Sequence, residues 1–116
     1  MPDYCRYNLS GHGPLEEAAG KVLEVITYAR EQGIRKLLID ATKWTGHAIP
    51  DTLERYQWTA AFAEASQSAV KVAMVLVPEM IDPEKFGVKV ARNRGMLVDV
   101  FDCEKQALAW LLAARG

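Results

Sequence analysis

Cysteine and histidine are scarce in this sequence, which has two of each. Cys5 and Cys103 lie far apart and fit no C-x-x-C or zinc-ligand spacing, and only His12 and His47 could complete a metal site with them. We therefore predict no structural metal and no bound cofactor, and we interpret both cysteines as reduced thiols.

Long apolar runs and an excess of one charge are also absent. Uninterrupted apolar stretches such as Val72–Val77 are too short to span a bilayer, and the N-terminus has no basic region followed by an apolar run. These absences predict a cytoplasmic protein without membrane insertion. Lys and Arg number 14 against 15 Asp and Glu, so the chain has no net positive field that would hold a nucleic acid.

The 116 residues, half of them hydrophobic, are enough for one domain with its own core. Residues 4–9 alternate in polarity with the period of a half-buried strand, and a helical pattern runs from Pro14 to Gly33. The apolar positions of that helix are Leu15, Ala18, Val22, Ile26 and Ala29. Leu37–Ile39 is a short, fully apolar run, which is typical of a strand covered on both faces.

The second half of the chain repeats this alternation. Its predicted elements are, in order, a helix from Asp51, a strand Val70–Val77, a helix from Asp82 to Gly95, a strand Leu97–Phe101 and a helix capped by Asp102. Strand and helix thus alternate four times. This order predicts a single α/β domain over residues 1–116, with a mixed, mainly parallel sheet of about four strands and about four helices.

The helix predicted from residue 51 has apolar residues on two faces. One face carries Leu53, Tyr56, Ala60 and Ala63. We expect that face to pack on the sheet, and Trp58 and Phe62 to emerge on the opposite side. A homodimer would bury these two aromatic side chains, but an apolar ligand between this helix and the next, or the neighbouring helix itself, would also do so.

The loop that follows Leu37–Ile39 collects polar and aromatic side chains: Asp40, Thr42, Trp44, Thr45, Gly46 and His47. Ligands of open α/β sheets bind outside the carboxyl ends of the strands, so this loop is a candidate ligand site. Trp44 could form a flat apolar wall, and His47 could titrate near neutral pH. Alternatively, the polar residues tie down turn amides and Trp44 covers the edge of the sheet.

Asp40 and His47 could also act as an acid–base pair in a small hydrolase or isomerase. No nucleophile or metal ligand accompanies them in the local sequence, so we expect no catalysis.

The third predicted helix is basic, with no acidic residue between Lys85 and Met96. At helical spacing Lys85, Lys89 and Arg92 share one face. This face is either a solvated surface with cations near the helix C-terminus or a docking patch for an acidic partner or a ligand phosphate.

The order of elements, together with a set of short motifs, resembles the STAS superfamily, and in particular its small SpoIIAA-like bacterial members. The motifs are Leu37–Asp40, Thr45–Gly46, Lys71–Val75, Phe86–Gly95, Val100–Asp102 with Ala107, and Trp110–Leu111. The resemblance covers residues 4–112. It implies a non-catalytic regulatory or small-ligand-binding module.

Two departures from the STAS pattern limit what the resemblance implies. Anti-sigma-factor antagonists carry an Asp-Ser-Ser-Gly element whose serine is phosphorylated, but the matching residues here, 47–52, contain no serine. A phosphorylation switch is therefore not implied. Such domains also begin with one more strand, for which this chain has almost no room. The edge of the sheet that this strand would pair with is either left unpaired or covered by something else.

Overall fold

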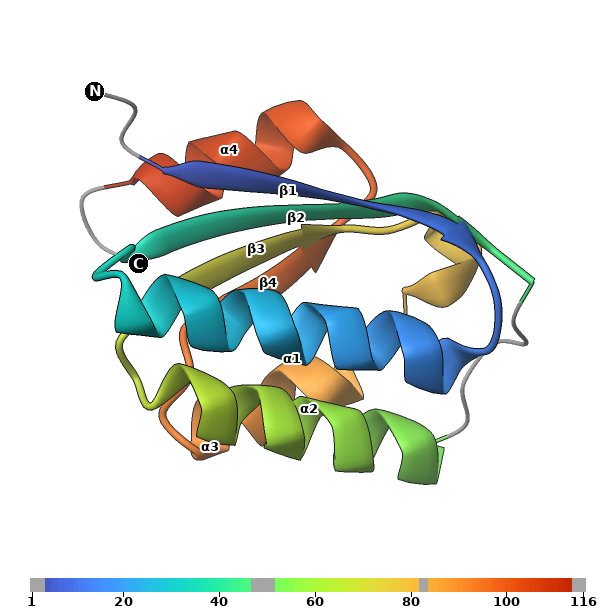
Figure 1. Cartoon of the computed structure of the whole chain (residues 1–116), viewed down its shortest axis with the longest axis horizontal. Coiled ribbons are helices and arrows are strands. Elements are labelled where there is room, and N and C mark those ends of the chain that lie inside the picture. Colours follow the sequence, from blue (N-terminus) through green and yellow to red (C-terminus); the bar gives the residue numbers. More distant parts are fainter. Residues whose placement is uncertain (1–3, 47–51, 82–83, 114–116) are drawn as a thin grey trace.

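Four parallel strands form one sheet, and their order in space, β1-β2-β3-β4, is their order in the chain (Figure 1). The computed structural model describes residues 4–46, 52–81 and 84–113. The strands are β1 (Cys5–His12), β2 (Lys36–Thr45), β3 (Lys71–Val75) and β4 (Val98–Phe101). The helices are α1 (Leu15–Glu31), α2 (Thr52–Ser66), the short 3-10 helix η1 (Pro78–Met80), α3 (Phe86–Asn93) and α4 (Glu104–Leu112).

The helices cover the two faces of the sheet unequally. Helices α1, α2 and α3 form a layer on one face, and α4 alone lies on the other (Figure 1). The predicted α/β class, with four strands and four helices, is confirmed. Within the described residues the sheet is entirely parallel rather than mixed, because a helix separates each strand from the next.

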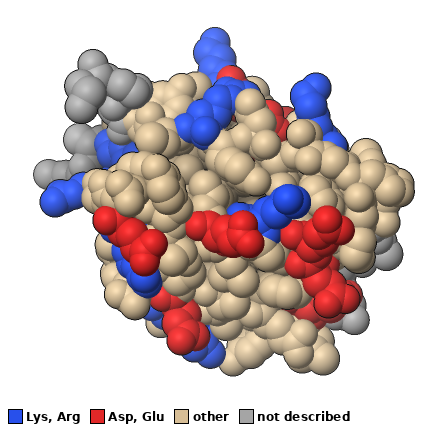
Figure 2. Space-filling model, in the orientation of Figure 1, with Lys and Arg blue, Asp and Glu red and all other residues tan. Residues whose placement is uncertain are grey.

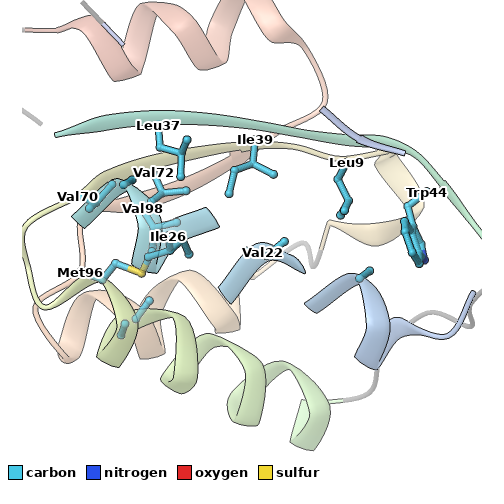
Figure 3. Packing of buried hydrophobic residues seen from close by; sticks show 14 residues of the cluster. Leu9, Val22, Ile26, Leu37, Ile39, Trp44, Val70, Val72, Met96 and Val98 are labelled. Carbon is cyan, nitrogen blue, oxygen red and sulfur yellow. The ribbon is translucent and has the colours of Figure 1, made fainter. Parts of the chain in front are cut away.

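Strand β2 is buried on both faces, as its apolar run predicts. Leu37 and Ile39 pack against the α1–α3 layer, and Leu38 packs against α4. Figure 3 shows the two side chains of the first group above Val22 and Ile26 of α1. Each such side chain contributes about 1.5–3 kcal/mol when it is fully removed from water, so this central strand anchors both layers.

The end of β2 differs from the prediction. The strand continues to Thr45, so the loop predicted from Thr42 is wrong for residues 42–45. Asn8 pairs with Asp40 but Ser10 pairs with Lys43, so β2 contains one extra residue between these pairs. This β-bulge shifts the alternation of side chains, and residues beyond it point to the opposite face from the one that strict alternation predicts.

Two helix starts also differ from the prediction. Helix α3 begins at Phe86 instead of near Asp82, which lies outside the described residues, because Lys85 is left-handed (φ 50°, ψ 47°) and interrupts helical geometry. Helix α4 has Cys103, not Asp102, at its N-cap position, and no side chain caps it. Both boundaries depend on backbone conformations that residue preferences alone do not determine.

None of the helices in the described parts of the chain is both long enough and apolar enough to cross a bilayer.

Candidate functional site

A cavity of about 180 Å³ lies between the sheet and the layer of α1, α2 and α3. It is lined by Leu9, Leu15, Ala18, Ala19, Val22, Ala41, Trp44, Trp58, Thr59, Phe62, Met74, Leu76, Val77, Met80, Ile81, Lys85, Gly87, Val88, Met96, Val98 and Val100. Most of the strand residues among them come from the carboxyl halves of their strands or from the residues just after β3. This is the end of a parallel sheet at which α/β proteins bind ligands.

The lining is almost wholly apolar. Its aromatic residues are Trp44, Trp58 and Phe62, and its sulfur-containing residues are Met74, Met80 and Met96. Thr59 and Lys85 are the only lining residues with polar side chains among the residues that the structure describes. The site is therefore suited to an apolar molecule and offers little for the recognition of a polar one.

Trp44 reaches this cavity because of the bulge in β2. Its side chain is 7% exposed, and its indole Nε1 donates a hydrogen bond of 3.1 Å to the carbonyl oxygen of Gly13. The indole ring lies against the backbone of Gly11, where a Cβ atom would approach the ring to 2.9 Å. Gly11 also has φ +145°, a conformation that other residues rarely adopt. Figure 3 shows Trp44 beside Leu9 at one end of the core.

Helix α2 turns a different part of its surface to the core than its sequence pattern predicts, although Ala63 of the predicted face is buried. Leu53 is 64% exposed and Tyr56 is 42% exposed, whereas Trp58 and Phe62 line the cavity. The prediction that Leu53 and Tyr56 pack on the sheet is wrong. The argument for a homodimer through Trp58 and Phe62 loses its basis, although the oligomeric state itself stays a prediction.

Helices α2 and α3 approach closely at the wall of the cavity. A Cβ atom at Gly87 would lie 2.9 Å from Oγ1 of Thr59, so a glycine is needed for this spacing. The two helices together thus form one side of the cavity, and a larger residue at position 87 would move them apart.

Asp40 and Thr42 lie apart from the cavity, in a hydrogen-bonded cluster. Thr42 donates to Oδ1 of Asp40 through its backbone nitrogen (3.0 Å) and its hydroxyl (2.6 Å). Arg6 donates to the other carboxylate oxygen at 3.4 Å and also pairs with Glu104 of α4. Burial raises the pKa of Asp40, but the hydrogen bonds from Thr42 and the charge of Arg6 outweigh it, and the net pKa is below its usual value.

Thr45 and Gly46 form a third environment, at the ends of β1 and β2. Oγ1 of Thr45 lies 3.0 Å from Nδ1 of His12, and Gly46 (φ +90°) packs so closely that its Cβ would lie 2.6 Å from that ring. His47 lies outside the described residues. The candidate loop residues are therefore not assembled into one site, and of those described only Trp44 reaches the cavity.

The basic residues of α3 are largely paired. Nζ of Lys85 lies 2.8 Å from Asp99, and Arg92 reaches the other oxygen of the same carboxylate at 3.6 Å. Nε of Arg92 also donates to the carbonyl oxygen of Val98 at the edge of β4 (3.2 Å), whereas Lys89 is exposed. Figure 2 shows positive and negative side chains interspersed on the face it presents, which does not favour a polyanion-binding surface there.

Lys71 is a buried cation that sequence reasoning did not identify. It is 7% exposed, its Nζ donates to the carbonyl oxygen of Trp110 at 2.8 Å, and it lies 4.5 Å from the centre of the Trp110 ring. Burial lowers the pKa of Lys71, and the nearby Lys36 lowers it further. Because its partner is in the last turn of α4, Lys71 stabilises the C-terminus of that helix.

No metal centre is indicated in residues 4–46, 52–81 and 84–113, where no three His, Cys, Asp or Glu side chains lie close enough to hold an ion. Cys5 and Cys103 are both free thiols.

Four of the candidate site residues from the sequence line the cavity, namely Trp44, Trp58, Phe62 and Lys85, but sequence reasoning missed the three methionines and Thr59. One signal could have indicated the methionines. Met74 lies in β3, Met80 precedes α3 and Met96 follows it, so all three belong to the β3–α3–β4 unit.

No protein-family model matches this chain, and neither does any curated protein or any solved structure. The functional assignment therefore rests on the cavity and its lining.

Proposed function

We propose that this protein is a non-catalytic module that binds a small apolar molecule in the cavity between the sheet and α1–α3. The observation that carries the proposal is the cavity itself, about 180 Å³ with an almost wholly apolar lining. Protein interiors contain few voids larger than a water molecule. The cavity is partly open to solvent, since Trp58, Phe62 and Met74 are only partly buried, and it leaves apolar surface that a ligand would cover. Its presence in a small domain favours a role in binding.

The chemistry of the lining supports binding without turnover. General acid–base or nucleophilic catalysis needs titratable groups next to the reacting atoms. Lys85 is the one charged side chain among the described lining residues, and Asp99 neutralises it. In the alternative hydrolase or isomerase, Asp40 would serve with His47. Asp40, however, is held by Thr42 and Arg6 outside the cavity, which does not favour that alternative.

The proposal includes the STAS-type resemblance, with ligand binding in place of a phosphorylation switch. Four successive strand–helix units support the resemblance, and the lack of serine in residues 47–52 is the reason that no phosphorylation switch is included. It also includes a cytoplasmic location, since two free thiols fit a reducing compartment. It leaves out the homodimer predicted from Trp58 and Phe62, because those side chains line the cavity.

A cavity-filling variant tests the proposal. Ala19 of α1 lines the cavity, and Ala19→Leu adds three carbon atoms there. A cavity of 150 Å³ holds one benzene molecule, so three carbon atoms occupy about 75 Å³. The volume left in the cavity of Ala19→Leu would then be well under the 150 Å³ that benzene needs. Ala109→Leu, at an exposed position of α4 on the other face of the sheet, is the matched control.

The measurement uses protein with ¹³C-labelled methionine methyl groups, because three methionines line the cavity. Toluene and dodecanoate are added separately as apolar probes. In the wild type we expect at least one probe to shift these methyl resonances saturably. Ala19→Leu should lose most of this shift, whereas Ala109→Leu should keep it. If neither probe shifts them, or if Ala19→Leu responds like the wild type, the proposal is wrong.

A further inference from the structure

We infer that the ligand is a small neutral aromatic molecule, a single ring with one small substituent, and not an acyl chain or an anion. This inference rests on the proposed function and specifies the class of molecule that the cavity takes. Three properties of the cavity carry it: its volume, the residue types of its wall and the state of its one charged residue.

The volume sets the size of the ligand. A buried apolar cavity of 150 Å³ binds benzene, which corresponds to about 25 Å³ per carbon atom. At this ratio the cavity of about 180 Å³ holds about seven carbon atoms. A twelve-carbon acyl chain would need about 300 Å³ by the same comparison, so about five of its carbon atoms would remain outside. The cavity therefore fits one ring with a methyl-sized substituent.

The wall favours an aromatic ring over a saturated one of the same size. Trp44, Trp58 and Phe62 supply ring faces and edges from β2 and α2, and these interact with another ring in stacked or edge-to-face geometry. Met74, Met80 and Met96 supply polarisable sulfur atoms, which make favourable contacts with aromatic rings. These six side chains line the cavity along its length, with Trp44 and Met96 towards opposite ends of the core (Figure 3), so a ring bound there would meet aromatic or sulfur-containing side chains.

The single charged residue excludes charged ligands. Lys85 approaches the cavity, but its ammonium group lies 2.8 Å from the Asp99 carboxylate and 5.5 Å from the centre of the Phe101 ring. An anionic ligand would have to displace the carboxylate of Asp99 from this pair. A cationic ligand would meet no carboxylate among the described lining residues, so nothing there would offset the loss of its hydration. A neutral molecule avoids both costs.

The test compares four probes on the methionine-labelled wild type: toluene, methylcyclohexane, benzoate and dodecanoate. We expect toluene to shift the methionine methyl resonances saturably. Methylcyclohexane should bind about two- to tenfold more weakly, in line with the energy of an aromatic contact. Benzoate and dodecanoate should bind at least tenfold more weakly than toluene or show no saturable shift. The toluene shifts should be lost in Ala19→Leu.

The outcomes separate this inference from the proposed function. Saturable binding of dodecanoate without toluene would overturn the size argument and leave an apolar binding module. Benzoate binding as tight as toluene would overturn the charge argument, and equal affinity for methylcyclohexane would overturn the aromatic preference. If no probe binds, the proposed function fails together with the inference.

Discussion

Trp44 provides the sharpest test of how the sheet builds the cavity. The bulge in β2 directs this residue into the helix-covered face, where it is 7% exposed and donates a hydrogen bond to Gly13. We predict that Trp44→Ala strongly destabilises the protein, because the substitution removes a large buried ring from the core. Trp44→Phe should be milder, since it keeps one ring and loses the indole N–H.

The magnitude follows from these contacts. Removal of a buried Trp side chain costs about 3–5 kcal/mol. For a domain of this size, this lowers Tm by roughly 10–20 °C. Trp44→Phe leaves the Gly13 carbonyl without its indole donor, and we expect a loss of about 1–2 kcal/mol. The order of stability is then wild type, Trp44→Phe and Trp44→Ala.

Urea unfolding followed by circular dichroism measures these differences. Tyr28→Ala is the control, because this aromatic side chain is 57% exposed and its loss should change the free energy of unfolding by about 0.5 kcal/mol or less. A Trp44→Ala variant that loses less than about 1 kcal/mol would show that the indole is not part of the core. The bulge would then not place Trp44 as described.

Other predictions concern pH, catalysis and the sheet edge. The lowered pKa of Asp40 implies stability that is present above pH 3.8 and lost as the pH falls through the lower folded value. The urea midpoint of Asp40→Asn should therefore fall less in acid than that of the wild type. Equal falls in the two proteins would contradict this. Because folding lowers the pKa of Lys71, the stability of the wild type should rise with pH between the folded pKa and 10.5, and that of Lys71→Met should not. Urea titrations at several pH values measure this. Parallel curves of stability against pH for the two proteins would contradict it. His47→Ala should leave toluene shifts in the NMR spectrum unchanged, whereas loss of a measurable hydrolase or isomerase activity in this variant would favour the enzyme alternative. Arg92→Ser should expose the edge of β4 and increase aggregation measured by light scattering. Lys89→Ser serves as the exposed control. Equal aggregation of the two variants would argue against a protective role of Arg92.

The sequence allowed the architecture to be predicted because its signals are local and redundant. The short apolar run Leu37–Ile39 is typical of a strand covered on both faces, and the spacing of apolar residues in α1 matches one buried face. Alternation of such elements then leads to a parallel sheet without knowledge of any contact between distant residues.

The cavity could not be predicted in the same way, since it depends on features with no periodic signature. Apolar residues lie on two faces of α2, so their pattern could not establish which face packs inward, and the prediction that Leu53 does so was wrong. One inserted residue in β2 decides where Trp44 points, and the left-handed conformation of Lys85 decides where α3 begins. Each depends on tertiary packing that overrides local preference.

The two edges of the sheet are not equally open to pairing with a further strand. Arg92 occupies a carbonyl group on the outer side of β4, whereas β1, twice as long, pairs with β2 alone in the described sheet. A subunit with two open edges can add neighbours at both ends and grow into a fibre. We therefore expect edge-to-edge contact between two copies to use β1 rather than β4.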